Sequence, residues 1–175
     1  MAQKNRLQYI ILGLLNERPQ SGYDLTKSFD ADIGEFWNAN HSQIYPLLKR
    51  MEDQELITHK TSIVGQKLEK KIYLITQLGT NIFKDWLHSP SILDQAHDEF
   101  ILKLYFISNR DNPQIKIMVA EQLQLHQAKL NTLKQQKITK FPDQEHINQD
   151  YGHFLVLNHA INREESYLSW LNTIE

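Results

Sequence analysis

Hydrophobic residues near the start of the chain recur every three or four positions, the spacing of one face of a helix. The first series ends shortly before Pro19, a stop signal, and consists of Leu7, Ile10, Ile11, Leu14 and Leu15. Ser21 and Asp24 have the spacing of a capping box and predict the start of a second helix. A third helix should begin near residues 40–42, which leaves Pro46 in or near its first turn. Its apolar series is Ile44, Leu47, Leu48 and Met51.

The pattern changes from helical to extended after the third helix. β-Branched residues are frequent in residues 57–63 and 72–76, which predicts a hairpin with its turn in residues 64–71. Thr76 then begins a fourth helix, whose buried side is predicted to carry Leu78, Ile82, Phe83, Trp86 and Leu87. Three helices followed by a hairpin is the order of a winged helix-turn-helix, a module that places its third helix in the major groove of DNA.

The second half of the chain shows helical patterns and no strand pattern. Helices are predicted over residues 98–108, over 113–140 with Asn112 as N-cap and Pro113 in the first position, and over 145–174. The fold class is therefore mainly α. Two domains are expected, a winged helix-turn-helix over residues 1–88 and an all-helical dimerisation and effector-response domain over residues 94–175.

Apolar residues in the last predicted helix form a heptad-like seam, with Glu164 in the open slot. Packing within the chain is one explanation of this seam. A helix–helix dimer interface is the other, and it is favoured because two long helices cannot bury two apolar stripes in so small a domain. The residues assigned to this dimer interface are Leu157, Ile161, Leu168 and Leu171.

The amino-acid composition and the absence of certain motifs exclude several classes of protein. The chain has 175 residues, 41% of them hydrophobic, and no cysteine, which excludes disulfides, thiolate metal sites and cysteine nucleophiles. It contains none of the common catalytic or phosphate-binding motifs, so we expect no enzyme, no cofactor and no metal. The apolar run in residues 7–15 is too short to span a bilayer, and no cleavage pattern follows it. A cytoplasmic protein without membrane contact is expected.

Charge is unevenly distributed in a chain whose net charge is −2. Residues 58–76 carry four lysines against one glutamate, which predicts a basic hairpin beside the polar face of the third helix. A solvated charged turn on a protein-interaction module would give the same pattern without DNA binding. If the module binds DNA, the candidate contacts are His41, Ser42, Gln43, Tyr45 and Lys49 on the third helix and Lys67, Lys70 and Lys71 on the hairpin.

Several motifs resemble the PadR family of transcriptional regulators, in its long subfamily with a C-terminal helical domain. The matching segments are Leu-Gly-Leu-Leu at 12–15, Ser-Gly-Tyr-Asp at 21–24, Phe-Trp at 36–37, His-Ser-Gln-Ile-Tyr-Pro at 41–46, residues 67–73, residues 98–108 and residues 151–157. The resemblance implies a homodimeric repressor of a phenolic acid decarboxylase gene on a partly palindromic operator. It also implies release by a hydroxycinnamic acid such as p-coumaric or ferulic acid. A regulator that responds to another small molecule would share the fold.

A flat aromatic acid needs an apolar, aromatic-lined slot with a few placed polar groups. Such a slot should touch both domains, because only differential binding to two conformations changes affinity for DNA. The candidate effector-binding residues are His153, Tyr151 and Phe154 in the second domain and Tyr23, Phe36 and Trp37 in the first. His153 is the expected polar contact.

Overall fold

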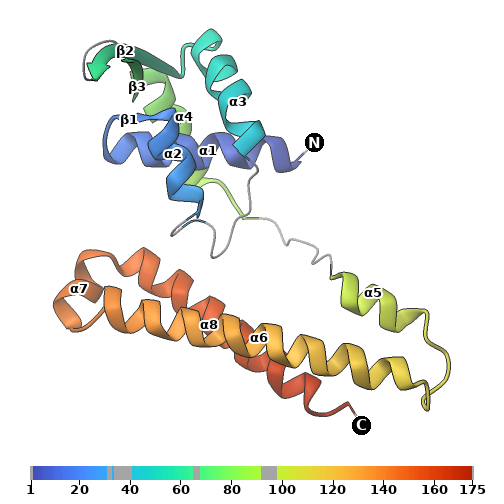
Figure 1. Ribbon diagram of the computed structural model, residues 1–175. Helices are drawn as coiled ribbons and strands as arrows, with labels where there is room; N and C mark the ends of the chain where they lie inside the picture. Colours follow the sequence, from blue (N-terminus) through green and yellow to red (C-terminus); the bar gives the residue numbers. More distant parts are fainter. Residues whose placement is uncertain (1, 31–32, 34–40, 65–67, 92–97, 175) are drawn as a thin grey trace. The chain divides into compact units, whose positions relative to one another are not determined.

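The structure is a computed structural model that describes the chain except residues 1, 31–32, 34–40, 65–67, 92–97 and 175 (Figure 1). The chain forms two compact units, residues 1–92 and 93–175. The division falls between residues 88 and 94, the inner bounds of the two predicted domains. Each unit is described by itself.

The first unit combines helices with a small antiparallel sheet, as the fold-class prediction required. Its elements are α1 (Ala2–Glu17), β1 (Gln20–Ser21), α2 (Gly22–Asp30), α3 (His41–Asp53), β2 (Ile57–Val64), β3 (Leu68–Ile75) and α4 (Gln77–His88). The strand order is β1-β3-β2. Strand β1 was not predicted, because two residues are too few for an alternating pattern; only the pairing of Gln20 with Tyr73 and of Ser21 with Ile72 makes it a strand.

The core of the first unit lies between α1, α2 and α3. The apolar series predicted for α1 and α3 face the core. The side chains without exposed surface include Ile11, Leu25, Ile44, Leu48 and Met51. Each buried side chain of this size stabilises the fold by about 1.5–3 kcal/mol relative to an exposed one. The three helices are therefore held as one rigid body.

The hairpin differs from its prediction. Continuous pairing from Ile57↔Ile75 to Val64↔Leu68 extends both strands into the residues that were predicted to form the turn. Lys70 and Lys71 thus belong to strand β3 and not to the turn, whereas Lys67 lies outside the described residues. The partner strand supplies backbone hydrogen bonds to these polar residues, and this pairing overrides their low β-propensity.

Two helices also depart from expectation. Pro46 lies in the second turn of α3, so it cannot donate a backbone hydrogen bond to the carbonyl of Ser42. In α4, Ile82 and Phe83 pack against the core, but Leu78 and Leu87 are exposed and were wrongly assigned to the buried side. The neighbouring Trp86 stacks on Tyr9 of α1, with ring centroids 4.7 Å apart.

The second unit consists of helices in its described part. They are α5 (Glu99–Tyr105), α6 (Pro113–Lys140), α7 (Gln144–Gln149) and α8 (Tyr151–Leu171), and the long α6 and α8 lie side by side (Figure 1). The predicted caps are present, since Asn112 accepts from the backbone N–H of Gln114 and Pro113 opens α6. The last predicted helix is divided, because the backbone of Asp150 leaves the helical region (φ −135°, ψ 55°).

The seam of α8 is filled by the chain itself. Leu157, Ile161 and Leu168 pack with Leu130 and Leu133 of α6, among others, and Leu171 packs with a second cluster that includes Phe100, Met118 and Val119. All four seam residues are at most 8% exposed. Packing within one chain therefore accounts for these four side chains, and their assignment to a dimer interface stays a prediction. The short helices α5 and α7 supply the additional cover.

Glu164 is the one charged residue among the buried residues of the described structure, with 2% exposure. Its carboxylate pairs with His126 and, at 3.1 Å, with Nζ of Lys129, both on α6. Burial raises the pKa of Glu164, but the hydrogen bonds from His126 and Lys129 outweigh it and the net pKa lies below the ordinary value. A lowered pKa stabilises the fold at pH values above the unfolded-state pKa, and this contribution disappears as the pH falls through the folded-state pKa.

We expect Glu164→Gln to lower the free energy of unfolding by about 1–3 kcal/mol at neutral pH, because hydrogen bonds to a buried charge are lost. Urea unfolding followed by circular dichroism measures this change. The matched control is Glu165→Gln, which breaks an exposed pair with Lys134 and should cost less than about 1 kcal/mol. Equal losses in the two variants would contradict the stabilising role of the buried carboxylate.

Candidate nucleic-acid interface

The polar residues predicted to contact DNA lie on the solvent-exposed face of α3. Ser42, Tyr45 and Lys49 are spaced by three and four positions and are exposed, and so is Gln43 beside them. His41 begins the helix, but its side chain lies outside the described residues. Arg50 is exposed on the same side and was missing from the predicted set, although its spacing of seven from Gln43 pointed to it.

Tyr45 is oriented by the beginning of α2. A Cβ atom at Gly22 would lie 2.7 Å from Cε1 of Tyr45, so the ring rests directly against the glycine backbone. The tyrosine nevertheless remains 54% exposed. Glycine at this position thus permits a close approach of α2 and α3 and holds the tyrosine on the outer surface of α3.

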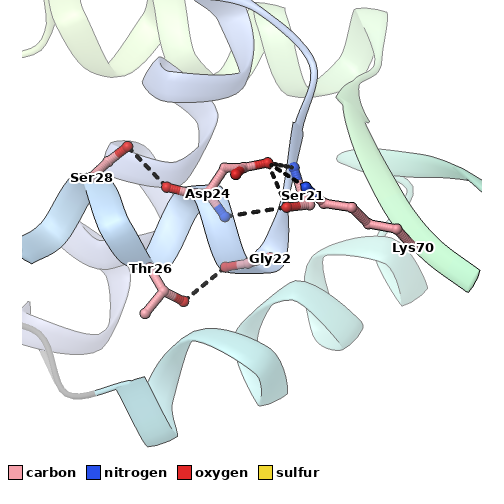
Figure 2. A network of polar contacts seen from close by, with 6 residues as sticks. All are labelled: Ser21, Gly22, Asp24, Thr26, Ser28 and Lys70. Carbon is pink, nitrogen blue, oxygen red and sulfur yellow. Dashed lines mark hydrogen bonds and ion pairs between the residues drawn. The ribbon is translucent and has the colours of Figure 1, made fainter. Parts of the chain in front are cut away.

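The start of α2 carries a capping box (Figure 2). The backbone N–H of Asp24 donates to Oγ of Ser21 at 3.2 Å, and the backbone N–H of Ser21 donates to Oδ2 of Asp24 at 3.2 Å. The Ser21 hydroxyl also donates to the same carboxylate oxygen, at 2.5 Å. This arrangement confirms the helix start predicted from the sequence and holds the carboxylate in one position.

Lys70 joins this capping box from strand β3. Its Nζ lies 3.2 Å from Oδ2 of Asp24, and both side chains are partly exposed. Figure 2 draws Lys70 beside this capping box. The Ser21 hydroxyl, and to a lesser degree Lys70, hold the pKa of Asp24 below its usual range despite the opposing effect of burial. The neighbouring Lys71 is exposed. The two lysines that the sequence grouped together therefore have different surroundings.

A second side-chain contact connects the other end of α3 to the hairpin. Glu52, near the C-terminal end of α3, pairs with His59 of β2, whose ring lies 5.9 Å from that of Tyr73. Burial, followed by the nearby Glu52 carboxylate, raises the pKa of Tyr73. The hairpin is thus connected by side-chain contacts to both α2 and α3.

The effector residues predicted in the second unit form an aromatic cluster around Phe141. The rings of His153 and Phe154 lie 5.6 and 5.5 Å from that of Phe141, and Tyr151 stacks on Phe154 at 6.2 Å. Lys137 places its Nζ 5.4 Å from the centroid of Phe154. Phe141 and Lys137 were missed, because they stand ten or more residues before the others and only the packing of α6 against α8 brings them together.

The effector residues predicted in the first unit are Tyr23, Phe36 and Trp37. Tyr23 is exposed on α2. Phe36 and Trp37 lie outside the described residues. Within the described part of the chain, no three His, Cys, Asp or Glu residues are grouped to hold a metal ion, and no helix is long and apolar enough to cross a membrane.

Comparison with known proteins identifies the family. The profile of the transcriptional regulator PadR-like family matches residues 11–85, and that of the virulence activator alpha C-terminal domain matches residues 96–175. The negative transcriptional regulator PadR of Bacillus subtilis is 44% identical over 173 residues, which cover 96% of this chain and 94% of the relative. The chain belongs to the PadR-like family of transcriptional regulators. The family expected from the sequence motifs is confirmed, and the chain is a regulator and not an enzyme.

Solved structures of PadR-like proteins show the same fold. Bacillus subtilis PadR in complex with operator DNA superposes with a TM-score of 0.84 at 41% identity, and the match covers 96% of this chain and 95% of that one. The same protein in complex with p-coumaric acid gives 0.80 at 39% identity with the same coverage. The Vibrio cholerae virulence activator AphA gives 0.76 at 26% identity, over 96% and 95% of the two chains.

We expect Ser21→Ala to raise the pKa of Asp24 toward its ordinary value of 3.8, because the hydroxyl is the strongest influence that lowers it. Titration of the Asp24 carboxyl carbon by NMR measures the change. Ser28→Ala is the control, since that hydroxyl donates to the backbone carbonyl of Asp24 and not to the carboxylate. An unchanged pKa in Ser21→Ala would assign the main effect to Lys70.

Proposed function

We propose that this PadR-like chain is a transcriptional repressor that binds double-stranded operator DNA with α3 and the β2–β3 hairpin. The observation that carries the proposal is the exposed polar face of α3, held rigid by its buried opposite face. A relative that is 44% identical is a negative regulator, and its structure with operator DNA superposes on this chain. The same relationship supports a cytoplasmic location, since a repressor acts where the DNA is.

The proposed contacts divide by chemistry. Gln43 and Tyr45 are exposed near the N-terminal end of α3, the end that meets base edges in helix-turn-helix proteins, and their polar groups can read bases. Lys49, Arg50 and Lys71 are exposed cations suited to phosphate. Affinity should therefore fall with salt, as for any complex built on neutralised phosphates.

We also propose that the repressor is a homodimer on a partly palindromic operator. Helix α5 supports this with apolar side chains that the chain leaves uncovered: Tyr105 is 81% and Phe106 73% exposed, and Ile101 and Leu102 are exposed beside them. A cluster of exposed apolar residues is typical of a protein–protein interface. This surface is a further candidate contact between two copies, in addition to the predicted seam of α8.

The proposed inducer is a hydroxycinnamic acid such as p-coumaric or ferulic acid, and the proposed target is a phenolic acid decarboxylase gene. The relative solved with p-coumaric acid supports this class of ligand. The cluster of Phe141, Tyr151 and Phe154 offers aromatic faces, Lys137 offers a cation for the carboxylate, and His153 offers a polar group for the phenol. Release requires that the acid bind more tightly to the conformation with low DNA affinity.

We expect the chain to retard a promoter fragment of a phenolic acid decarboxylase gene in a gel shift at fixed moderate salt, with two chains per fragment. Gln43→Ala with Tyr45→Ala should reduce this affinity by at least about tenfold, because base contacts are worth about 1–3 kcal/mol each. The complex is quantified by titration, and its stoichiometry by sedimentation.

The matched control for this prediction is Gln114→Ala, an exposed glutamine in the first turn of α6. It should leave the affinity unchanged. Retention of full affinity by the Gln43 and Tyr45 double variant would overturn the assignment of α3. Failure of the unchanged protein to bind at low salt would favour a protein-interaction module.

We expect p-coumaric acid to release the retarded fragment, and His153→Ala to raise the half-releasing concentration by about tenfold, which corresponds to the loss of one polar contact of about 1.4 kcal/mol. Affinity for DNA without the acid should not change. His146→Ala is the control, because His146 is exposed on α7 and pairs with Asp143. Release of the His153 variant at the original concentration would place the acid elsewhere.

A further inference from the structure

Lys70 and Lys71 follow one another on strand β3, so their side chains leave the sheet on opposite faces. The side chain of Lys70 turns toward α2 and ends 3.2 Å from Asp24, whereas that of Lys71 is exposed to solvent. Across the hairpin, Lys70 stands opposite Ser62 and Lys71 opposite Thr61. Equal roles for the two lysines in phosphate binding, as sequence composition suggests, do not fit this geometry.

The carboxylate of Asp24, which accepts from Lys70, is already held in position by hydrogen bonds from Ser21. Oδ2 of Asp24 receives the backbone N–H and the hydroxyl of Ser21, which belong to the capping box of α2 (Figure 2). An ion pair with a pre-oriented partner loses less side-chain entropy than one between two mobile groups. Lys70 therefore connects β3 to a rigid point of α2.

This connection lies where the hairpin leaves the body of the unit. Ser21 pairs with Ile72 through the backbone, two residues from Lys70, so the ion pair extends the junction between β1 and β3 toward the hairpin turn. Beyond Lys70 the hairpin continues without a pairing strand from β1. The angle of the projecting part relative to α2 and α3 thus depends on this last contact.

The pairing also affects how Lys70 can interact with DNA. Lys70 and Asp24 together carry no net charge, and a phosphate at Lys70 would lie close to the carboxylate. An ammonium group paired in this way releases few counterions on DNA binding, whereas an exposed lysine that meets a phosphate releases about one.

We propose that Asp24 and Lys70 are positioning residues that hold the hairpin at the angle needed for DNA binding, and that Lys71 supplies the phosphate contact of this strand. The inference rests on the proposed function, since it specifies how the hairpin takes part in operator binding. Asp24 is not among the predicted DNA contacts, but the proposal gives it a part in operator binding. Its carboxylate favours binding because it holds Lys70 and the hairpin in position.

The test measures operator affinity over a series of salt concentrations for Lys70→Met, Asp24→Asn and the double variant, with Lys71→Met as the matched neighbour. Lys71→Met should lower the slope of log affinity against log salt by about one. Lys70→Met and Asp24→Asn should each weaken binding several-fold with a slope changed by less than about half of that. The double variant should be no weaker than either single one, and Lys70→Arg should bind like the unchanged protein.

Three outcomes overturn the proposal. A slope reduced by about one in Lys70→Met would make Lys70 a phosphate contact. Tighter binding by Asp24→Asn would show that the carboxylate only repels DNA, and additive losses in the double variant would show that the two residues act independently. Circular dichroism and thermal melting confirm that each variant is folded.

A second measurement on the DNA-free protein separates this inference from the proposed function. Hydrogen exchange of the backbone amides in β2 and β3 should be faster in Lys70→Met and Asp24→Asn and unchanged in Lys71→Met, because only the first two lose the connection to α2. If the unchanged protein bound no operator, the proposed function would fail while this measurement still decided whether the ion pair holds the hairpin. Unchanged exchange in all three variants would overturn the positioning role.

Discussion

The burial of one face of α3 is the constraint on which the proposed DNA-binding surface depends. Ile44, Leu48 and Met51 have no exposed surface, and they pack against α1 and α2 in a single core. Since a helix is rigid over a few turns, burying one face determines the direction of the opposite one. The buried residues of α3 therefore hold Gln43 and Tyr45 on the exposed face of the helix. Gly22 lets the ring of Tyr45 pack closely against the start of α2.

In the first unit, the local pairing of polar and charged side chains matters more than the net charge of the chain. The net charge of −2 gives no general attraction to DNA, and two polar side chains of the hairpin are engaged with carboxylates within the chain. Lys70 contacts Asp24, and His59 contacts Glu52. Such pairs add little stability when exposed, but each joins two elements of the unit. The hairpin is connected in this way to both helices of the helix-turn-helix.

In the second unit, a buried charged residue also pairs with side chains of another helix. Glu164 of α8 faces His126 and Lys129 of α6, and Tyr167 stacks on His126 while it donates to the N-cap residue Asp98 of α5 at 2.6 Å. A buried carboxylate is tolerated only where such partners are in place, so it specifies how the helices align as well as adding stability. The exposed apolar side chains of α5 are part of the proposed contact with a second copy.

Hydrophobic periodicity and caps such as Ser21 and Asn112 predicted most of the helices, the hairpin and the division into two units, because both are local properties. The family was identified by the resemblance of its sequence motifs. Only the tertiary structure decided which of two adjacent lysines is paired, which apolar stripe is used internally and which aromatic residues surround Phe141. It also revealed strand β1, which exists only through its pairing with β3. These features depend on contacts between residues far apart in the chain, and spacing along a sequence carries no information about a partner 46 residues away.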